Sequence, residues 1–215
     1  MCSEIKESRQ YGCTSLCREI VTRAYTLGRR AEQQAETRLR IVEAAVALHG
    51  EFGPAQTTLS MVAERAGVQR HTLYAHFPDE RSLLMACSGL SLERDPLPNP
   101  AAWREIPDRY VRLRTGLAAL YDWYERNADL TDCVLRDAGF HPLTREIAEL
   151  RYGPFMSAYA EALGTKLNAR QRAMLQLALG YFTWRSLVRD SRLKSVAAAR
   201  IMALAIENAR GAQPT

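Results

Sequence analysis

Hydrophobic residues recur at three- and four-residue spacing along most of this 215-residue chain. Between residues 40 and 53, Ile41, Ala44, Ala45 and Leu48 follow this spacing, which places them on one face of a helix. Gly53 and the proline after it end the segment. Few segments alternate apolar and polar residues as strands do, so the pattern predicts an all-α protein.

Two shorter apolar stripes follow between residues 58 and 77. The hydroxyl of Thr58 can accept a hydrogen bond from the first turn of a helix, which makes it a good N-cap. Gly67 suits the left-handed backbone of a sharp turn, and Leu73 and Phe77 lie four residues apart, on one face of a second helix. The stripe of the first helix is Leu59, Val62, Ala63 and Ala66. The pattern therefore predicts a helix-turn-helix.

The remaining chain is predicted to form a larger helical body. Three prolines at positions 96, 98 and 100 cannot lie inside a helix, so they separate a helix leaving the first domain from those that follow. The expected helices are 79–93, 103–128, 131–138, 141–163, 168–188 and one that Ser195 caps. We therefore expect an N-terminal arm (1–35), a helix-turn-helix domain (36–82) and a C-terminal helical domain (83–215).

The second helix of the predicted hairpin carries polar side chains on the face away from its apolar stripe. These side chains suit a DNA groove, because Arg can donate two hydrogen bonds to guanine, Gln can pair with adenine and Tyr or His can reach phosphate oxygens. An ordinary helical hairpin with a solvated polar face is the alternative for each residue alone. The face comprises Gln69, Arg70, His71, Thr72, Tyr74 and His76.

The joint pattern resembles the TetR/AcrR family of bacterial transcriptional regulators. The matching positions are Thr57–Thr58, Val62–Ala63, Ala66–Val68, Thr72–Tyr74 and His76–Phe77, with no gaps in spacing. The resemblance extends to residues 40–53, which look like the first helix of that family. It implies a three-helix DNA-binding domain and a C-terminal domain that binds a small-molecule effector and dimerises.

Two positions depart from the family pattern. His49 stands where relatives place an aromatic core residue such as Phe, and it is expected to be a partly buried, hydrogen-bonded histidine. Glu80 stands near the position of a phosphate-contacting Lys, where a carboxylate would repel DNA, so Arg81 is a hypothetical substitute for that contact. The candidate DNA-binding residues are Thr58, Ser60, Gln69, Arg70, His71, Thr72, Tyr74, His76 and Arg81.

The last two predicted helices carry more apolar surface than one neighbour can cover. Asn168 and Gln171 form a box-like cap at the start of the first of them. The resemblance implies that two such helices from each subunit form a four-helix dimer bundle, although both could be buried in the monomer core. A twofold dimer would read a palindromic operator. The candidate interface residues are Met174, Leu177, Tyr181, Val188, Ile201, Leu204 and Ala205.

The same resemblance implies an effector cavity among the middle helices, although aromatic stripes can equally be ordinary core. Arg136 and His141 could orient a polar ligand group in it. The candidate lining residues are Cys87, Tyr121, Tyr124, Cys133, Arg136, His141, Tyr152, Phe155, Met156, Tyr159 and Trp184. Asp137 with His141 lacks the further His or Cys that a zinc site needs, so we expect no metal and no cofactor.

Charge adds little support for DNA binding. The net charge is +5, but residues 36–82 hold five basic and six acidic side chains, so the excess lies elsewhere. Part of the N-terminal arm, which carries Arg18, Arg23, Arg29 and Arg30, could extend the first helix and part could be disordered. The arm could follow the minor groove or be a disordered leader. The five cysteines lack paired spacing, so disulfides are not expected, and Cys2, Cys13 and Cys17 could form a redox sensor.

These observations favour a ligand-responsive repressor that acts as a homodimer on double-stranded DNA. The chain has no secretory signal and no apolar run of membrane-spanning length, so we expect a cytoplasmic protein without membrane contact. Two alternatives remain open. One is a helical dimer that has lost DNA reading and binds proteins, and the other is an all-α enzyme, which the lack of GxSxG, GxxxxGK and HExxH disfavours.

Overall fold

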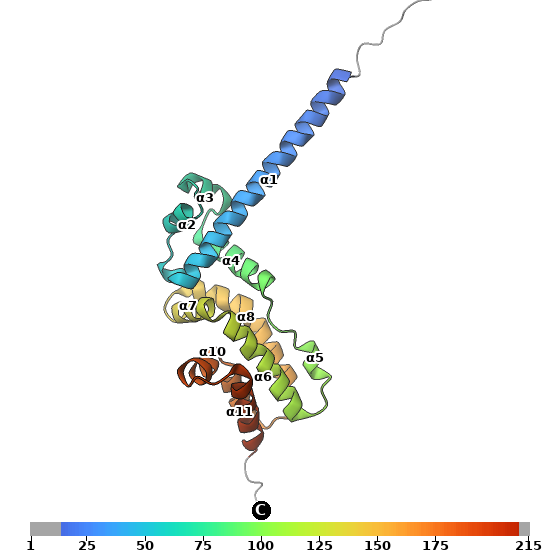
Figure 1. The fold of residues 1–215 in the computed structure, drawn as a ribbon, viewed down its shortest axis with the longest axis vertical. Helices are drawn as coiled ribbons and strands as arrows, with labels where there is room; N and C mark the ends of the chain where they lie inside the picture. The colour runs from blue at the N-terminus through green and yellow to red at the C-terminus, as the bar shows by residue number, and fades with distance from the viewer. Residues whose placement is uncertain (1–13, 211–215) are drawn as a thin grey trace, which may run out of the picture.

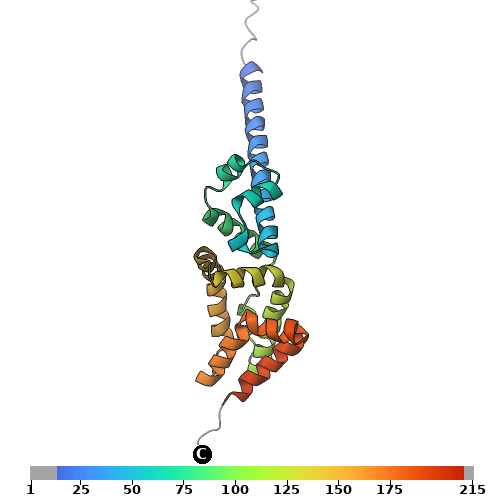
Figure 2. The ribbon, with the colours of Figure 1, turned by 90° about the vertical axis from the view of Figure 1, so that its left-hand side faces the viewer.

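The computed structural model describes residues 14–210, with side chains from Arg29 onward. The described chain is built from helices joined by short connections and has no strand, which confirms the all-α prediction. Figure 1 and Figure 2 show an N-terminal helical domain on top of a larger helical body, with a long helix projecting away from both. Cys2 and Cys13 and the side chain of Cys17 lie outside the described residues.

The N-terminal domain packs three helices around a small apolar core. The first, α1 (Thr14–Glu51), is followed by the short 3₁₀ turn η1 (Pro54–Gln56), α2 (Leu59–Arg65) and α3 (Arg70–His76). The predicted stripes form this core: Ile41, Ala45, Leu48, Val62, Ala63, Leu73 and Phe77 are all buried. α4 (Glu80–Arg94) leaves the domain and packs Leu83 and Cys87 against it.

The body is built around a second, larger core. Its helices are α5 (Ala101–Arg104), α6 (Arg109–Arg126), α7 (Ala128–Ala138), α8 (Pro142–Leu163), α9 (Ala169–Leu179), α10 (Tyr181–Arg185), a π-helical turn η2 (Ser186–Asp190) and α11 (Ser195–Asn208). Large buried side chains such as Trp184, Tyr121 and Tyr159 fill the centre. The predicted capping box of Asn168 and Gln171 is present at the start of α9.

The described part of the N-terminal arm is helical: α1 begins at Thr14 and continues through position 35, so this part of the arm extends the first helix. Predicted helix boundaries in the body were wrong. The expected helix 103–128 is broken because Pro107 cannot continue a helix, and Asp108 caps α6 instead. Ser195 is the first residue of α11 and does not cap it; its hydroxyl donates to the Glu125 carboxylate at 2.6 Å.

The expected continuous helix after Asn168 is also interrupted. Gly180 has an extended backbone (φ −71°, ψ 134°), so α9 ends there and α10 starts in a new direction. Leu177 O accepts hydrogen bonds from Gly180 N and from the Thr183 hydroxyl, which satisfies a carbonyl that the helix end leaves free. Within residues 14–210, no helix is both long and apolar enough to cross a membrane.

Candidate DNA-binding surface and effector cavity

The hairpin of α2 and α3 has the geometry that the sequence predicted. Thr58 Oγ1 accepts a hydrogen bond from Met61 N at 3.2 Å, which caps α2. Gly67 adopts φ +64° in the turn, and Val68 N closes the turn by donating to Ala63 O at 2.9 Å. Leu73 lies on the buried face of α3, which anchors the helix to the core. The opposite face of α3 is therefore turned outward and held rigidly.

The structure places most of the candidate DNA-binding side chains on that outward face. Arg70 is exposed and makes no hydrogen bond or ion pair with any described residue, and Tyr74 is 43% exposed. Thr58 uses its hydroxyl as the cap of α2. The other exposed candidates are Ser60, Gln69 and His71, and the partly exposed ones are Thr72 and His76.

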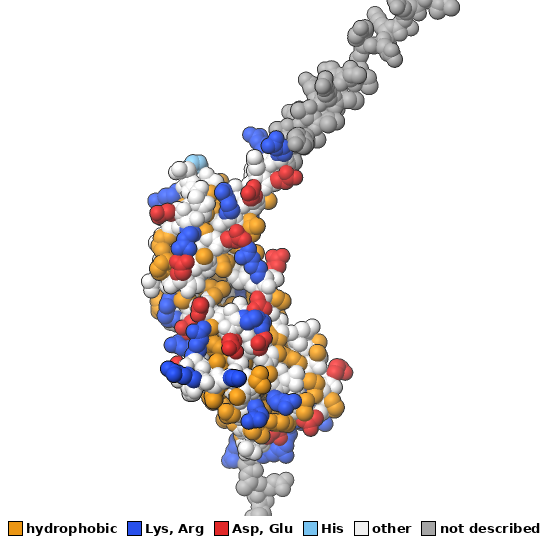
Figure 3. Space-filling view, in the orientation of Figure 1, with side chains coloured by type: hydrophobic (Ala, Val, Ile, Leu, Met, Phe, Trp, Pro, Cys, Tyr) orange, Lys and Arg blue, Asp and Glu red, His pale blue; other side chains and the backbone are white. Residues whose placement is uncertain are grey.

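Arg81 is paired with the body of the protein. Its guanidinium forms an ion pair with Glu146 of α8 at 2.6 Å, so its charge is held against the body. Glu80 also faces the body, with Oε1 3.8 Å from His141 Nε2. On the face shown in Figure 3, basic and acidic side chains are mixed over the N-terminal domain. No basic patch is therefore seen over the N-terminal domain on this face.

A buried polar contact fastens the N-terminal domain to α7. Asp137 is fully buried, and its Oδ2 accepts a hydrogen bond from Ala55 N of η1 at 2.9 Å. Arg136 Nε donates to Asp137 Oδ1 at 2.8 Å, and Arg136 Nη2 donates to Phe52 O at 2.8 Å. Cys133 lies beside them, with Sγ 3.5 Å from Gly50 O. We call Cys133, Arg136 and Asp137 with these partners the interdomain latch.

His49 lies at the same interface and is only 5% exposed. Burial lowers the pKa of His49 to about 4, and the nearby Asp137 carboxylate opposes this shift only in part. The imidazole is therefore neutral at pH 7. The sequence predicted a partly buried, hydrogen-bonded histidine. His49 is instead almost fully buried, and its side chain makes no hydrogen bond with any described residue.

This shift predicts a pH dependence of stability. Between pH 7 and pH 5 the unfolded chain protonates His49, whose ordinary pKa is 6.5, while the folded chain does not, so stability falls. The expected loss at pH 5 is about 2 kcal/mol, and it levels off below the folded pKa of about 4. Urea unfolding of wild type and His49→Phe at both pH values tests this. Equal losses in the two proteins would contradict it.

The body contains a large cavity of about 410 Å³. Its walls come from α6, α7, α8, α9 and α10, and exposed Arg145, Glu149 and Gln176 mark its opening to solvent. A volume of this size suits a drug-sized ligand. The lining residues are Trp123, Tyr124, Thr131, Leu135, Ala138, Arg145, Ala148, Glu149, Tyr152, Gly153, Met156, Gln176, Leu179, Gly180 and Tyr181.

Only Tyr124, Tyr152 and Met156 of the candidate lining residues belong to this cavity. Cys87 lines a much smaller cavity of about 40 Å³ between the two domains, and His141 lies in the turn before α8, with its Nδ1 2.7 Å from Thr144 Oγ1. The other candidates also lie outside it: Cys133 and Arg136 in the latch, Tyr121, Tyr159 and Trp184 in the core, and Phe155 on the outer face of α8.

The sequence missed Trp123, Thr131, Leu135, Arg145, Glu149 and Gln176. Helical spacing could have indicated part of this lining, because Thr131, Leu135 and Ala138 are four and three residues apart and so share one face of α7. Among the side chains that the structure describes, no group of three His, Cys, Asp or Glu residues gathers to hold a metal ion.

An unpartnered apolar face covers α9, α10 and α11. Leu177 is 55% exposed, Ile201 43% and Leu204 45%, while Met174, Val188 and Ala205 are partly exposed. Phe182 and Val196, absent from the candidate interface, extend this face. Tyr181 was wrongly assigned to it: the side chain is buried, and its hydroxyl donates to Ala128 O at 3.0 Å.

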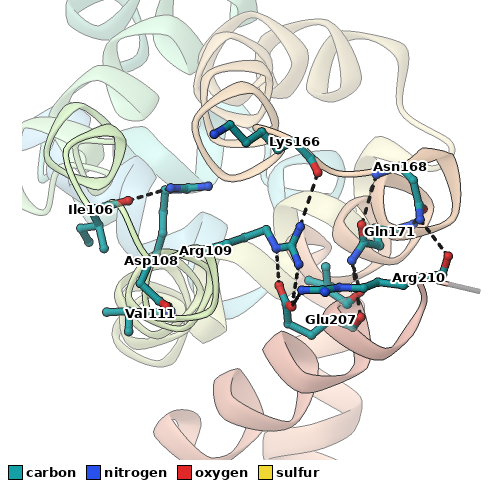
Figure 4. Close-up of polar contacts among 11 residues, drawn as sticks. Ile106, Asp108, Arg109, Val111, Lys166, Asn168, Gln171, Glu207 and Arg210 are labelled. Atoms are coloured by element: carbon teal, nitrogen blue, oxygen red, sulfur yellow. Dashed lines mark hydrogen bonds and ion pairs between the residues drawn. The ribbon is translucent and has the colours of Figure 1, made fainter.

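Polar contacts fix the helices that carry this apolar face. Gln171 Nε2 of α9 donates to Ile206 O of α11 at 3.1 Å, and Arg109 Nε of α6 donates to Glu207 Oε1 at 2.6 Å. Figure 4 shows Arg210 approaching the same carboxylate, to which it donates at 2.5 Å. These contacts hold α11 in register against α6 and α9, so the face is preformed.

Comparison with known proteins now identifies the architecture. Residues 41–87 match the family model for bacterial regulatory proteins of the tetR family. An HTH-type transcriptional regulator of Mycobacterium tuberculosis, uncharacterized, is 32% identical over 146 residues, which are 66% of this chain and 71% of that protein. The chain belongs to the TetR family. It is thus a bacterial regulatory protein.

Further TetR relatives agree with this assignment. The chain is 33% identical over 106 residues to the transcriptional repressor KstR of Mycolicibacterium smegmatis, where the match spans 49% of this chain and 52% of KstR. PfmR of Thermus thermophilus shares the fold with a TM-score of 0.57 and 21% identity, covering 81% of this chain and all of PfmR. FadR of Bacillus subtilis, solved in complex with stearoyl-CoA, has a TM-score of 0.56 at 18% identity, and the match covers 78% of this chain and 96% of FadR.

Proposed function

We propose that this TetR protein is a homodimeric repressor that binds a palindromic operator and is released by a small-molecule effector. The observation that carries the proposal is the outward face of α3, on which exposed Gln69, Arg70 and His71 stand over a buried Leu73. A rigid helix with such a face can enter a major groove and present hydrogen-bond donors to base edges.

The apolar face of α9, α10 and α11 supports dimerisation. Exposed Leu177, Ile201 and Leu204 would lose their contact with water if two copies paired through this face. A twofold axis there would present two α3 helices on the same side of the dimer. Helices about one DNA turn apart, roughly 34 Å, would read two half-sites of a palindrome.

Effector release needs a mechanical connection between cavity and DNA-binding domain, and α7 supplies one. Thr131, Leu135 and Ala138 on one face of α7 line the cavity. Arg136 and Asp137 on another face form the latch with the end of α1 and with η1. A ligand that pushes α7 outward would therefore move the DNA-binding domain directly. The ligand shifts the population toward the released state only if it binds that state more tightly than the DNA-bound state.

The ligand of a solved neighbour supports an effector with an apolar part. FadR of Bacillus subtilis was solved with stearoyl-CoA, so a protein of this fold does hold a ligand with a large apolar part. For this chain, the cavity of about 410 Å³ supports a ligand of comparable apolar character.

Dimer disruption tests the proposal. Replacing Leu204 by Glu places a charge on the apolar face, so we expect the chain to become monomeric and to lose at least about tenfold in operator affinity. Analytical ultracentrifugation and an electrophoretic shift assay with DNA adjacent to its coding region measure both effects. Phe140→Glu, at an exposed apolar position between α7 and α8, is the matched control. A Leu204→Glu dimer with full affinity would contradict the proposal.

A further inference from the structure

The first helix extends far beyond the domain to which it belongs. α1 has 38 residues, but among its described side chains burial begins only at Ile41. Residues 14–37, which we call the projecting helix, add about 36 Å at about 1.5 Å per residue. Figure 1 and Figure 2 both show this helix running past the α2–α3 hairpin and away from the body. It therefore leaves the molecule at the end that carries α3.

Contacts of Arg38 fix the base of the projecting helix against α3. Arg38 Nη1 donates to the backbone oxygen of His76, the last residue of α3, at 3.2 Å. The Arg38 guanidinium also lies over the Phe77 ring, 4.2 Å from its centroid. Phe77 is fully buried in the core of the domain. The direction of the projecting helix is therefore set relative to α3, the helix that the proposed function places in the major groove.

The projecting helix is exposed and carries a net positive charge. Residues 14–40 contain six arginines and three glutamates, whereas residues 36–82 hold five basic and six acidic side chains. Every side chain from residue 29 to residue 36 is exposed, so no described element covers this stretch. Arg29 and Arg40 are eleven residues apart, about three helical turns, and so share one face. The positive charge that the DNA-binding domain lacks is thus on this helix.

The width of a helix decides which part of a duplex it can meet. An α-helix with its side chains is about 10–12 Å across, and the minor groove of DNA is only about 6 Å wide. The helical part of the arm therefore cannot enter the minor groove, which excludes one of the sequence-based expectations. Arginines on a helix that lies across the phosphate backbones can instead contact phosphate oxygens without reading bases.

We infer that the projecting helix binds, as a continuous helix, the phosphate backbone of the DNA that flanks each half-site. The inference rests on the proposed function, because it extends the contacts of the same operator complex. A helix of about 36 Å spans roughly ten base pairs at about 3.4 Å each. The projecting helix supplies affinity that does not depend on sequence, and α3 supplies sequence recognition.

Two operator duplexes test this inference, one ending at the outer edges of the half-sites and one extended by about 12 base pairs on each side. At about 50 mM salt, the full chain should bind the longer duplex at least about tenfold more tightly. This gain should shrink about tenfold by about 200 mM salt, because each of the two projecting helices neutralises at least one phosphate. Fluorescence anisotropy measures both affinities.

A pair of arginine substitutions locates the contact. Arg29→Gln with Arg30→Gln should remove most of the gain on the longer duplex and leave binding to the short duplex unchanged. Arg170→Gln with Arg172→Gln is the matched control, because it removes the same charge at exposed positions at the start of α9. This control should keep the full gain.

Substitutions of Gly28 test whether the helix must be continuous. Gly28 lies inside α1, so Gly28→Pro breaks the helix and Gly28→Ala strengthens it, and neither changes the charge. The gain on the longer duplex should fall in Gly28→Pro and be kept or increased in Gly28→Ala. A gain that survives Gly28→Pro would assign the contact to a flexible arm and overturn the inference.

Three further results would overturn the inference: equal binding of the two duplexes, a full gain in the Arg29 and Arg30 variant, or an equal loss by that variant on both duplexes. Ultracentrifugation of this variant without DNA should show the assembly state of the wild type, and a changed state would assign the helix to pairing between copies instead. Wild type that binds neither duplex contradicts the proposed function. Tight binding to both duplexes without a gain contradicts only the contact of the projecting helix.

Discussion

Replacing Gly53 by alanine is expected to lower the free energy of unfolding by about 3 kcal/mol, the largest loss of stability among the substitutions proposed here. Gly53 has φ +94°, a conformation that side chains rarely adopt. A Cβ atom there would lie 2.3 Å from both Arg136 Nη2 and Asp137 Oδ2. The substitution therefore adds backbone strain and separates the charged atoms of the interdomain latch.

Gly67→Ala is the matched control for this prediction. Gly67 also has positive φ, +64°, but a Cβ atom there meets nothing within 4 Å. Its cost should be backbone strain alone, about 1 kcal/mol. Chemical denaturation of both variants measures the difference. If Gly53→Ala and Gly67→Ala lower stability equally, the latch contributes nothing beyond backbone conformation.

Arg70→Ala is expected to weaken operator binding by a factor of about 10 to 100 for each half-site, because one bidentate contact to a base is worth about 1–3 kcal/mol. Both half-sites of a dimer lose this contact, so the losses combine. Arg70 is exposed on α3 and binds no described residue, so the substitution should not alter the fold. Fluorescence anisotropy at fixed salt measures the affinity.

Unrelated duplex DNA provides the control for Arg70. Non-specific affinity depends mainly on phosphate contacts, so it should fall far less than operator affinity. Arg65→Ala removes an equal charge from α2, where Arg65 pairs with Glu51 at 2.8 Å, and should change operator affinity only slightly. An equal loss on operator and unrelated DNA would place Arg70 on the phosphate backbone and contradict its role as a base-reading residue.

The N-terminal domain could be predicted closely because its determinants are local. Thr58 and Gly67 mark the two ends of α2 through their own backbone preferences, and the buried Leu73 and Phe77 follow from helical spacing. The breaks in the body depend on equally local residues, Pro107 and Gly180. They were missed because strong apolar periodicity on both sides of each break suggested one continuous helix.

The cavity could not be predicted because its lining comes from five helices whose packing is set by the whole fold. Tyr181 illustrates the difficulty: it belongs to an apolar stripe, and the stripe alone does not say whether the neighbour is the body or a second subunit. Trp123, beside the predicted Tyr124, lines the cavity while Tyr121 lies in the core.

The interdomain latch was equally hidden in the sequence. Residue types show only that Asp137 is acidic and Arg136 basic, which suggests a metal-binding or ligand-binding role. Their partners are backbone atoms, Ala55 N and Phe52 O, about 80 residues away in the chain, and a backbone partner leaves no signature in residue type. Only the fold brings them together.

The most direct test of this account is hydroxyl-radical footprinting of the full chain on DNA adjacent to its coding region. Two α3 helices in successive major grooves predict two protected half-sites related by a twofold axis, with centres about one helical turn apart, 10–10.5 base pairs. Both should disappear together in Arg70→Ala. Protection of a single half-site, or protection that Arg70→Ala leaves intact, would contradict the proposed operator recognition.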